Sequence, residues 1–182
     1  MASGRGRSPG GYTLVEVLII VVVLSIAAAM VIPSMGSVDV LKVQAAVRTA
    51  VSDITFAQSD ALAYQERRAI IFDVEENRYM LLSVSGANLD PENNVLFDGT
   101  KRGQQYIVDF DDPEFNGAQL VSAKIDDDHI LVYDELGGPV RDPSGDVPSA
   151  GGTITITGNG QTYTISIEAF TGRVTVAAGN GG

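Results

Sequence analysis

The sequence predicts an α+β fold, in which one long N-terminal helix packs on antiparallel β-sheets. Two observations lead to this prediction. Helical patterns fill the first third of the chain, where an apolar run over residues 14–32 is followed by apolar residues at helical spacing. Short alternating segments bounded by turn residues fill the rest, which is typical of β-strands. The 182 residues are enough for one such helix and one modest domain.

The apolar run is the candidate membrane anchor. Residues 14–32 are about as many as the shortest helix that spans a bilayer needs. Glu16 is the one charged residue in the run, and an ionisable group in a membrane segment is costly enough to imply a function and a partner. The partner we expect is the N-terminal amine that Tyr12 of a neighbouring copy would gain if the chain were cut after Gly11. In the alternative interpretation, Glu16 lies at the membrane interface and stays solvated.

Pro33 follows the apolar run and predicts a kink in the helix. The helix is expected to resume beyond it, because apolar residues recur at alternating three- and four-residue steps, and polar residues such as Asp53 lie largely off that stripe. We therefore expect a transmembrane helix over residues 12–33 and its amphipathic continuation over residues 34–66. The stripe that faces the sheet consists of Val40, Val43, Val47, Ala50, Ile54, Ala57 and Ala61.

Residues 67–178 are expected to form a β-rich globular domain, followed by a flexible tail over residues 179–182. The turn Asn159-Gly160 between two alternating segments is the clearest hairpin signal, because this pair tolerates the positive φ that such turns need. Two loops rich in turn-forming residues interrupt the strands at 85–103 and 141–152. The expected strands are 69–72, 79–82, 106–108, 120–121, 130–133, 153–157, 163–167 and 173–176.

A short basic leader precedes the apolar run. It contains Arg5 and Arg7 and ends with the small pair Gly10-Gly11. In a secretory signal peptide the cleavage site follows the hydrophobic region, whereas a cut after Gly11 would remove only residues 1–11 and keep the helix. The two arginines place the N-terminus in the cytoplasm. The chain is thus expected to cross the membrane once, with its C-terminal domain outside, which is the periplasm if this is the inner membrane of a bacterium with two membranes.

The junction between leader and helix resembles the class III signal of type IV pilins and type II secretion pseudopilins, in which Phe is more common than Tyr at the position of Tyr12. The resemblance implies a pilin-like fold, cleavage after Gly11 by a prepilin peptidase, and N-methylation of Tyr12. It also implies that Thr13 and Glu16 serve assembly of the subunit into a helical filament, whose core the helix over residues 12–33 would form. The residues that carry it are Gly11, Tyr12, Thr13, Leu14, Val15 and Glu16.

The C-terminal half resembles the H-type minor pseudopilins, also called the GspH/FimT family. A strand that ends in Gly137-Gly138-Pro139, a Thr/Ile hairpin and the turn Thr171-Gly172-Arg173-Val174 carry this resemblance. It implies a minor pseudopilin, a structural subunit of a type II secretion pseudopilus, with no enzymatic activity and no cofactor. The implied partners are other pseudopilins or pilins in a hetero-oligomeric filament, the prepilin peptidase and the inner-membrane assembly platform.

Two other functions stay open. One is a minor type IV pilin, including a DNA-receptor pilin for DNA uptake. The other is a membrane-anchored periplasmic binding domain that never polymerises. A formal net charge of −11 makes nucleic acid an unlikely partner, since DNA binding needs basic residues to displace counterions from phosphate. Arg173 is accordingly interpreted as a turn or partner-contact residue. The absence of cysteine excludes disulfides and thiol catalysis.

Two acidic stretches are candidate sites of chemistry. Oxygen ligands crowded into one short loop are able to hold Ca²⁺, but this loop lacks the glycine and the spacing of an EF-hand, so a solvated acidic loop is the favoured interpretation and no metal site is expected. His129 is the only histidine and follows three aspartates, which favours a solvated turn over a catalytic site. The weak calcium candidates are Asp109, Asp111, Asp112 and Glu114.

Overall fold

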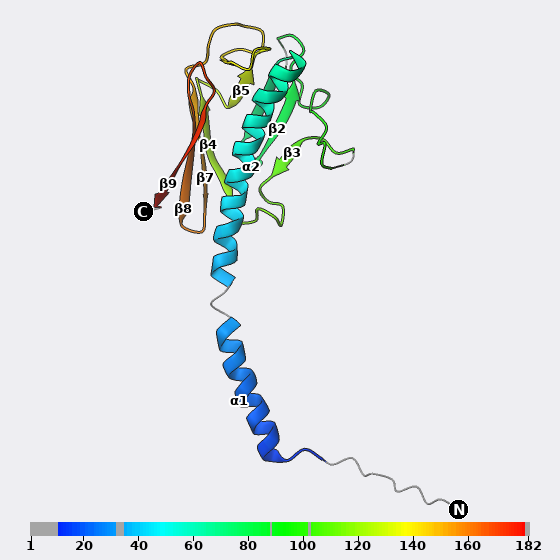
Figure 1. Ribbon diagram of the computed structural model, residues 1–182, viewed down its shortest axis with the longest axis vertical. Coiled ribbons are helices and arrows are strands. Elements are labelled where there is room, and N and C mark those ends of the chain that lie inside the picture. The colour runs from blue at the N-terminus through cyan, green and yellow to red at the C-terminus, as the bar shows by residue number, and fades with distance from the viewer. Residues whose placement is uncertain (1–10, 32–34, 88, 102, 181–182) are drawn as a thin grey trace, which may run out of the picture. The chain divides into compact units, whose positions relative to one another are not determined.

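A computed structural model describes residues 11–31, 35–87, 89–101 and 103–180 (Figure 1). The chain divides into two compact units, Met1–Val38 and Asp39–Gly182. Helices and two antiparallel sheets make up the fold, so the predicted α+β class is confirmed. The kink predicted at Pro33 lies outside the described residues.

The first unit contains helix α1, Leu14–Val31. It begins two residues later than expected, at Leu14, because Thr13 forms the N-cap. The large apolar side chains along α1 are exposed, from Leu14 at 82% to Ile26 at 57%. Within the part of the chain that the structure describes, no helix combines the length and the apolarity that crossing a membrane requires.

Helix α2, Met35–Tyr64, lays its apolar stripe on the sheets of the second unit. The predicted stripe is confirmed: Val40 is half-buried and its other members are buried. Asp53 departs from the prediction. Its polarity placed it off the buried stripe, but its side chain is only 6% exposed. The helix ends where Gln65 takes a φ of 53°, a left-handed conformation that stops helical hydrogen bonding.

The first sheet has five strands in the order β3-β2-β1-β5-β6. The predicted hairpin forms its centre, with Asn77 at a φ of 50° in the turn. The central strands bury side chains in two clusters, the core that contains α2 and a second cluster that includes Leu82, Val132 and Val95. This double burial explains why these strands are continuously apolar. Its strands are β1 Arg68–Asp73, β2 Arg78–Ser83, β3 Ile107–Asp109, β5 Ile130–Tyr133 and β6 Pro139–Val140, and the sequence pattern does not predict the last of them.

The second sheet has four strands in the order β4-β7-β8-β9. A bulge at Val121 interrupts the pairing of β4 with β7, and the strand is longer than predicted. The expected tail also needs correction, because Gly179 and Asn180 pair with β8 and only residues 181–182 lie beyond the described part. The strands are β4 Gln119–Ile125, β7 Gly152–Gly158, β8 Gln161–Ile167 and β9 Val174–Asn180.

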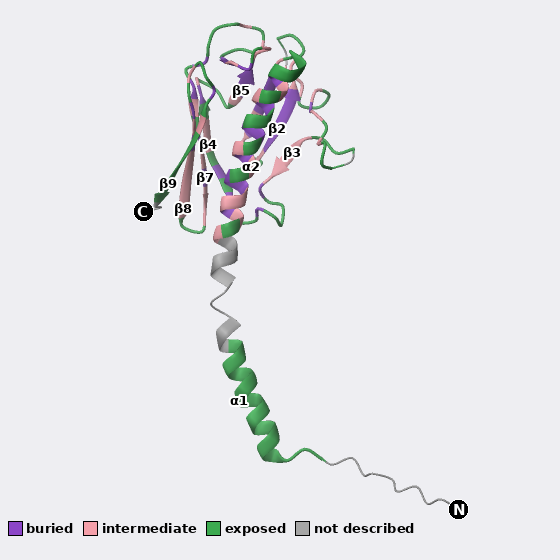
Figure 2. Cartoon of the chain, viewed as in Figure 1, coloured by how far each residue is buried: buried purple, intermediate pink, exposed green. Residues whose placement is uncertain are grey.

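One core joins α2 to both sheets, and the buried residues line the facing sides of all three (Figure 2). Gln58 of α2 reinforces this arrangement at one end of the core. Its side-chain amide donates hydrogen bonds to the carbonyl of Gly137, in the turn after β5, at 2.8 Å and to that of Thr171, in the turn before β9, at 2.9 Å. The helix thereby holds one turn of each sheet.

Candidate functional site

The first turn of α1 is built by Thr13. Its Oγ1 accepts a hydrogen bond from the amide of Glu16 at 3.2 Å, and its carbonyl accepts from the amides of Glu16 and Val17. A Thr three residues before a Glu is the sequence pattern of a capping box, in which the N-cap hydroxyl satisfies an amide that the helix itself leaves unpaired. Thr13 therefore fixes where the helix begins, and so fixes the position of Glu16.

Glu16 lies in the first turn of α1 and its side chain is exposed. A carboxylate in this position is favoured by the partial positive charge of the helix N-terminus. Gly11 and Tyr12 precede the helix and are exposed as well, so the predicted cleavage junction is accessible in the chain. The structure thus brings Tyr12, Thr13 and Glu16 together within one short segment.

The rest of α1 presents an apolar surface on every side. Val, Ile and Leu residues from Val15 to Ile26 are between 46% and 64% exposed, and the helix has almost no polar face. A helix that is apolar all round requires an apolar environment, either lipid or other helices. The exposed surface of α1 is therefore a site for burial against something else.

A second polar feature lies inside the core of the second unit. The carboxylate of Asp53, on α2, accepts hydrogen bonds from the hydroxyls of Tyr79 at 2.6 Å and Tyr106 at 2.9 Å. Burial raises the pKa of Asp53, and the two hydrogen bonds partly offset that rise. Burial also raises the pKa of Tyr79 well above its ordinary value, so its hydroxyl stays a donor. This cluster ties α2 to β2 and to the residue before β3.

The calcium candidates are not brought together. Asp109 Oδ1 accepts from the amide of Asp111 at 2.8 Å, and Asp111 Oδ1 accepts from the side chain of Asn77 at 2.8 Å, so these oxygens hold turns. Among the described residues, no three His, Cys, Asp or Glu side chains are placed to share a metal ion.

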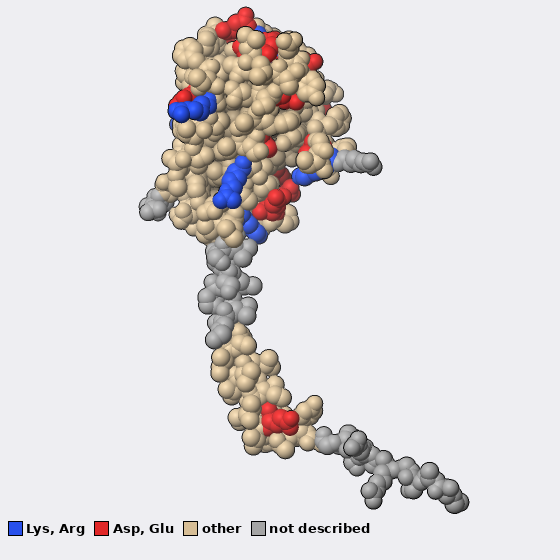
Figure 3. All heavy atoms as spheres, in the orientation of Figure 1, with Lys and Arg blue, Asp and Glu red and all other residues tan. Residues whose placement is uncertain are grey.

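The two remaining candidates lie on the surface. His129 is exposed and contacts Asp128, at 2.7 Å between Nδ1 and Oδ1. Arg173 is paired with Glu168 across the turn between β8 and β9, and this pair lowers the pKa of the Glu168 carboxyl. On the face shown in Figure 3, the basic side chains are scattered and gather into no patch.

Residues 7–32 match the family model of the prokaryotic N-terminal methylation motif. No curated protein sequence matches the chain. Among solved structures, the minor pseudopilin EpsH from the Type 2 Secretion System of Vibrio cholerae is similar, with a TM-score of 0.52 and 10% identity over 75% of this chain and 97% of that chain. The type IV minor pilin FimU of Pseudomonas aeruginosa gives a TM-score of 0.46 and 19% identity over 74% of this chain and 87% of that chain.

Residues 7–32 carry the N-terminal methylation motif, and the second unit packs α2 on two antiparallel sheets, so the chain combines two features of type IV pilin-like proteins. Within this class, the chain has the fold of the minor pseudopilin EpsH. The match to the methylation motif confirms the resemblance at the leader junction, and the match to EpsH confirms the fold that the resemblance in the C-terminal half implies.

Proposed function

We propose that this chain is a minor pseudopilin, a structural subunit of a type II secretion pseudopilus. The observation that carries the proposal is the exposed helix α1, which is apolar apart from Glu16 and Ser25 and begins two residues after Tyr12 of a methylation motif. The fold shared with EpsH, a minor pseudopilin of a Type 2 Secretion System, supports secretion over the alternative of a pilus.

The precursor is cut after Gly11 by a prepilin peptidase, and the new N-terminus at Tyr12 is methylated. Removal of residues 1–11 takes away Arg5 and Arg7 and leaves the apolar segment on the mature chain. Residues 12–33 then anchor the subunit in the inner membrane, with the N-terminus in the cytoplasm and residues 67–178 in the periplasm. The inner-membrane assembly platform takes up the subunit from this state.

Assembly moves α1 from lipid into a bundle of similar helices from other pseudopilins. Lipid and helix bundle are similarly apolar, so burial of apolar surface alone distinguishes them poorly. Glu16 makes the bundle more favourable than lipid, because its carboxylate pairs there with the N-terminal amine of a neighbouring Tyr12. The capping of α1 by Thr13 keeps Glu16 close to the chain's own N-terminus and on a rigid helix.

The DNA-receptor alternative is less well supported. A phosphate-binding surface needs unpaired basic side chains, whereas Arg173 is paired with Glu168 and the chain carries a net charge of −11. The proposed subunit has a structural role, and no enzymatic activity is proposed for it.

The experiment that tests this function replaces Glu16 in cells that produce the secretion system. Glu16→Leu and Glu16→Ala should leave the chain in the membrane but reduce its amount in filaments sheared from the cells. The exposed Val15→Leu serves as the matched control, because it alters the neighbouring position without changing charge. Normal incorporation of both Glu16 variants would contradict the proposed mechanism.

A further inference from the structure

Strand β9 forms an edge of the four-stranded sheet. It pairs with β8 over its whole length, from Val174 opposite Ile167 to Asn180 opposite Gln161, without a register shift. Within the described residues nothing pairs with its other side. The strand contains no charged residue, proline or bulge, which are the devices that usually protect an edge from pairing with another chain.

The free backbone groups of β9 are identified by the pairing with β8. The amide of Glu168 donates to the carbonyl of Arg173 at 2.9 Å, which makes this a hydrogen-bonded pair. Antiparallel pairs alternate, so Thr175, Ala177 and Gly179 bond to β8. The amides and carbonyls of Val174, Val176 and Ala178 therefore point away from the sheet, where a further strand would lie.

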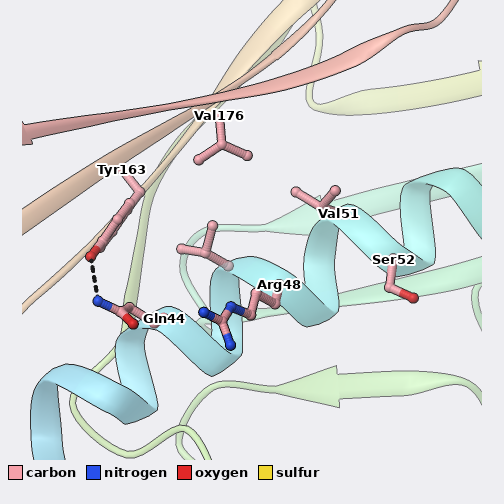
Figure 4. A pocket seen from close by; sticks show the side chains of 7 residues that line it. Gln44, Arg48, Val51, Ser52, Tyr163 and Val176 are labelled. Carbon is pink, nitrogen blue, oxygen red and sulfur yellow. Dashed lines mark hydrogen bonds between the residues drawn. The ribbon is translucent and has the colours of Figure 1, made fainter.

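A groove lies beside this edge, between the sheet and α2 (Figure 4). Its cavity has a volume of about 530 Å³, and its apolar lining consists of Val47 and Val51 of α2 and Val176 of β9. Val176 lies on the same face of the sheet as the buried Ile165 opposite it, yet it is 47% exposed. The core of the domain is thus left open at β9.

The groove has one cationic side chain. Arg48 lines it and is exposed, and within the described residues it forms no ion pair. The other polar side chains in the lining are neutral, and two of them, Gln44 and Tyr163, hydrogen-bond to each other at 3.3 Å. An occupant that carries a carboxylate would match this charge.

We propose that β9 and this groove form a docking site for an extended segment of another protein, in which apolar side chains alternate and one carboxylate lies among them. The segment adds to β9 as a fifth strand of the sheet, because main-chain hydrogen bonds at a free edge accept a strand and not a helix. Its alternate apolar side chains fill the groove against Val51 and Val176, and a carboxylate among them pairs with Arg48. This interface is separate from α1 and does not depend on the proposed filament function.

A second copy of this chain fits the site less well. Pairing of β9 with another β9 would satisfy the free backbone groups, but the strand has no carboxylate to offer Arg48. Its residues Ala178 and Gly179 are also too small to fill an apolar groove. The chemistry of the site therefore favours a different polypeptide.

The test uses the full chain in detergent micelles and a synthetic peptide of about eight residues. The peptide alternates Thr with Val, replaces one central Val by Asp, and is blocked at both ends. A second peptide carries Lys in place of Asp. Binding is measured by fluorescence anisotropy with a dye on the peptide.

The wild type should bind the Asp peptide, and Arg48→Glu should weaken this binding by about tenfold or more while it strengthens binding of the Lys peptide. Lys42→Glu, on the same helix but outside the groove lining, is the matched control and should change neither value by more than about twofold. Ala178→Pro removes an outward amide and should abolish binding of both peptides, whereas Ala178→Val keeps the amide and should retain it. Far-ultraviolet circular dichroism of each variant checks that the sheet is intact.

Three results would overturn the proposal. The first is no binding of the Asp peptide at millimolar concentration. The second is binding that survives Ala178→Pro in a folded variant, because the peptide would then not be paired with β9. The third is self-association of the wild type that Ala178→Pro abolishes, which would make a second copy the occupant. Each result leaves cleavage after Gly11 and the role of Glu16 untouched, so a failure here is distinguishable from a failure of the proposed function.

Discussion

The hydroxyl of Tyr79 donates a 2.6 Å hydrogen bond to the carboxylate of Asp53 inside the core. Tyr79 is 1% exposed and Asp53 is 6% exposed, so water cannot easily replace either partner. A buried donor that loses its acceptor costs more than the bond itself contributed. This pair therefore gives α2 and the five-stranded sheet a polar link that depends on both partners.

Asp53→Ala should lower the free energy of unfolding by about 2–3 kcal/mol, because it leaves the buried Tyr79 hydroxyl unpaired. Asp53→Asn retains one acceptor oxygen and should cost about 1 kcal/mol. Denaturant unfolding of the full chain in micelles, followed by circular dichroism, measures both. Equal losses for the two variants would show that the hydrogen bond from Tyr79 does not carry the effect.

The stability of the fold should also depend on pH through Asp53. Burial raises the pKa of this carboxyl in the folded chain, so the folded state holds the proton more tightly than the unfolded state. The resulting stabilisation is complete below the unfolded pKa of about 3.9 and is lost as the pH rises through the folded value. Wild type should therefore lose stability relative to Asp53→Asn as the pH rises from about 4 to about 7.

The control for this pH series is Asp112→Asn, which replaces an exposed carboxylate by the same amide. A dependence on pH that both Asn variants share would reflect the loss of a carboxylate in general and not the burial of Asp53. A wild type that gains stability relative to Asp53→Asn with rising pH would contradict the expected direction of the pKa shift.

Gln58 should contribute to the free energy of unfolding mainly through the two hydrogen bonds that its side chain donates, and less through the packing of its side chain. Gln58→Ala removes the bonds to Gly137 and Thr171 and should cost about 1–2 kcal/mol. Gln58→Glu should cost more, because it turns an acceptor-only carboxylate toward two carbonyl oxygens. Ser59→Ala, at the next position of α2, removes only a bond within the helix and is the control. Denaturant unfolding compares the three variants, and a Gln58→Glu protein as stable as wild type would rule out the predicted role.

The hydrogen bonds of Arg67 should hold the 141–152 loop in its folded conformation. The guanidinium donates to Glu135 at 3.0 Å, to Asp146 at 2.5 Å and to the carbonyls of Pro143 and Gly145. Arg67→Ala should therefore release the loop and raise the rate of tryptic cleavage after Arg141 by about tenfold. Arg67→Lys should not restore protection, since one ammonium cannot reproduce the planar fork of donors.

Arg173→Ala is the control for the proteolysis experiment, because it removes an exposed arginine that does not contact this loop. Mass spectrometry of the fragments identifies the cut. Unchanged cleavage after Arg141 in the Arg67→Ala protein would mean that other contacts, such as the hydrogen bond from Ser149 to Asp126, hold the loop without it.

Thr13→Val should loosen the first turn of α1 while it keeps the shape of the side chain. The loss of the N-cap hydroxyl should destabilise the first turn of the helix by about 1 kcal/mol. Faster amide exchange at Glu16 and Val17 in micelles, measured by nuclear magnetic resonance, is the expected result, and Thr13→Ser should restore protection. Equal exchange in Thr13→Val and wild type would show that the cap does not hold this turn.

Much of the fold could be predicted from the sequence because the patterns that specify it are local. The apolar stripe from Val43 to Ala61 has helical period, and the strands on either side of Asn159-Gly160 alternate cleanly, so both patterns indicate which side chains are buried. The spacing of Thr13 and Glu16 is a local pattern too, and Thr13 caps the helix. The sequence does not indicate this role, because both residues also belong to the cleavage motif.

The remaining features depend on contacts between residues that are distant in the chain. Asp53 is buried because Tyr79 and Tyr106 supply donors from other elements, which no helical pattern reveals. The strand at Pro139–Val140 is too short to predict, and its pairing with β5 defines it. Gly179 and Asn180 have the composition of a tail but are ordered by the register with β8.

The proposed function depends most on processing at the Gly11–Tyr12 junction with retention of the apolar helix. This processing is tested by the intact mass and N-terminal sequence of the protein recovered from membranes, with and without a prepilin peptidase. We predict a chain that begins at N-methylated Tyr12 when the peptidase is present and retains residues 1–11 when it is absent. A chain that keeps its leader in the presence of the peptidase, or that is cut beyond Ile32, would contradict the proposed function.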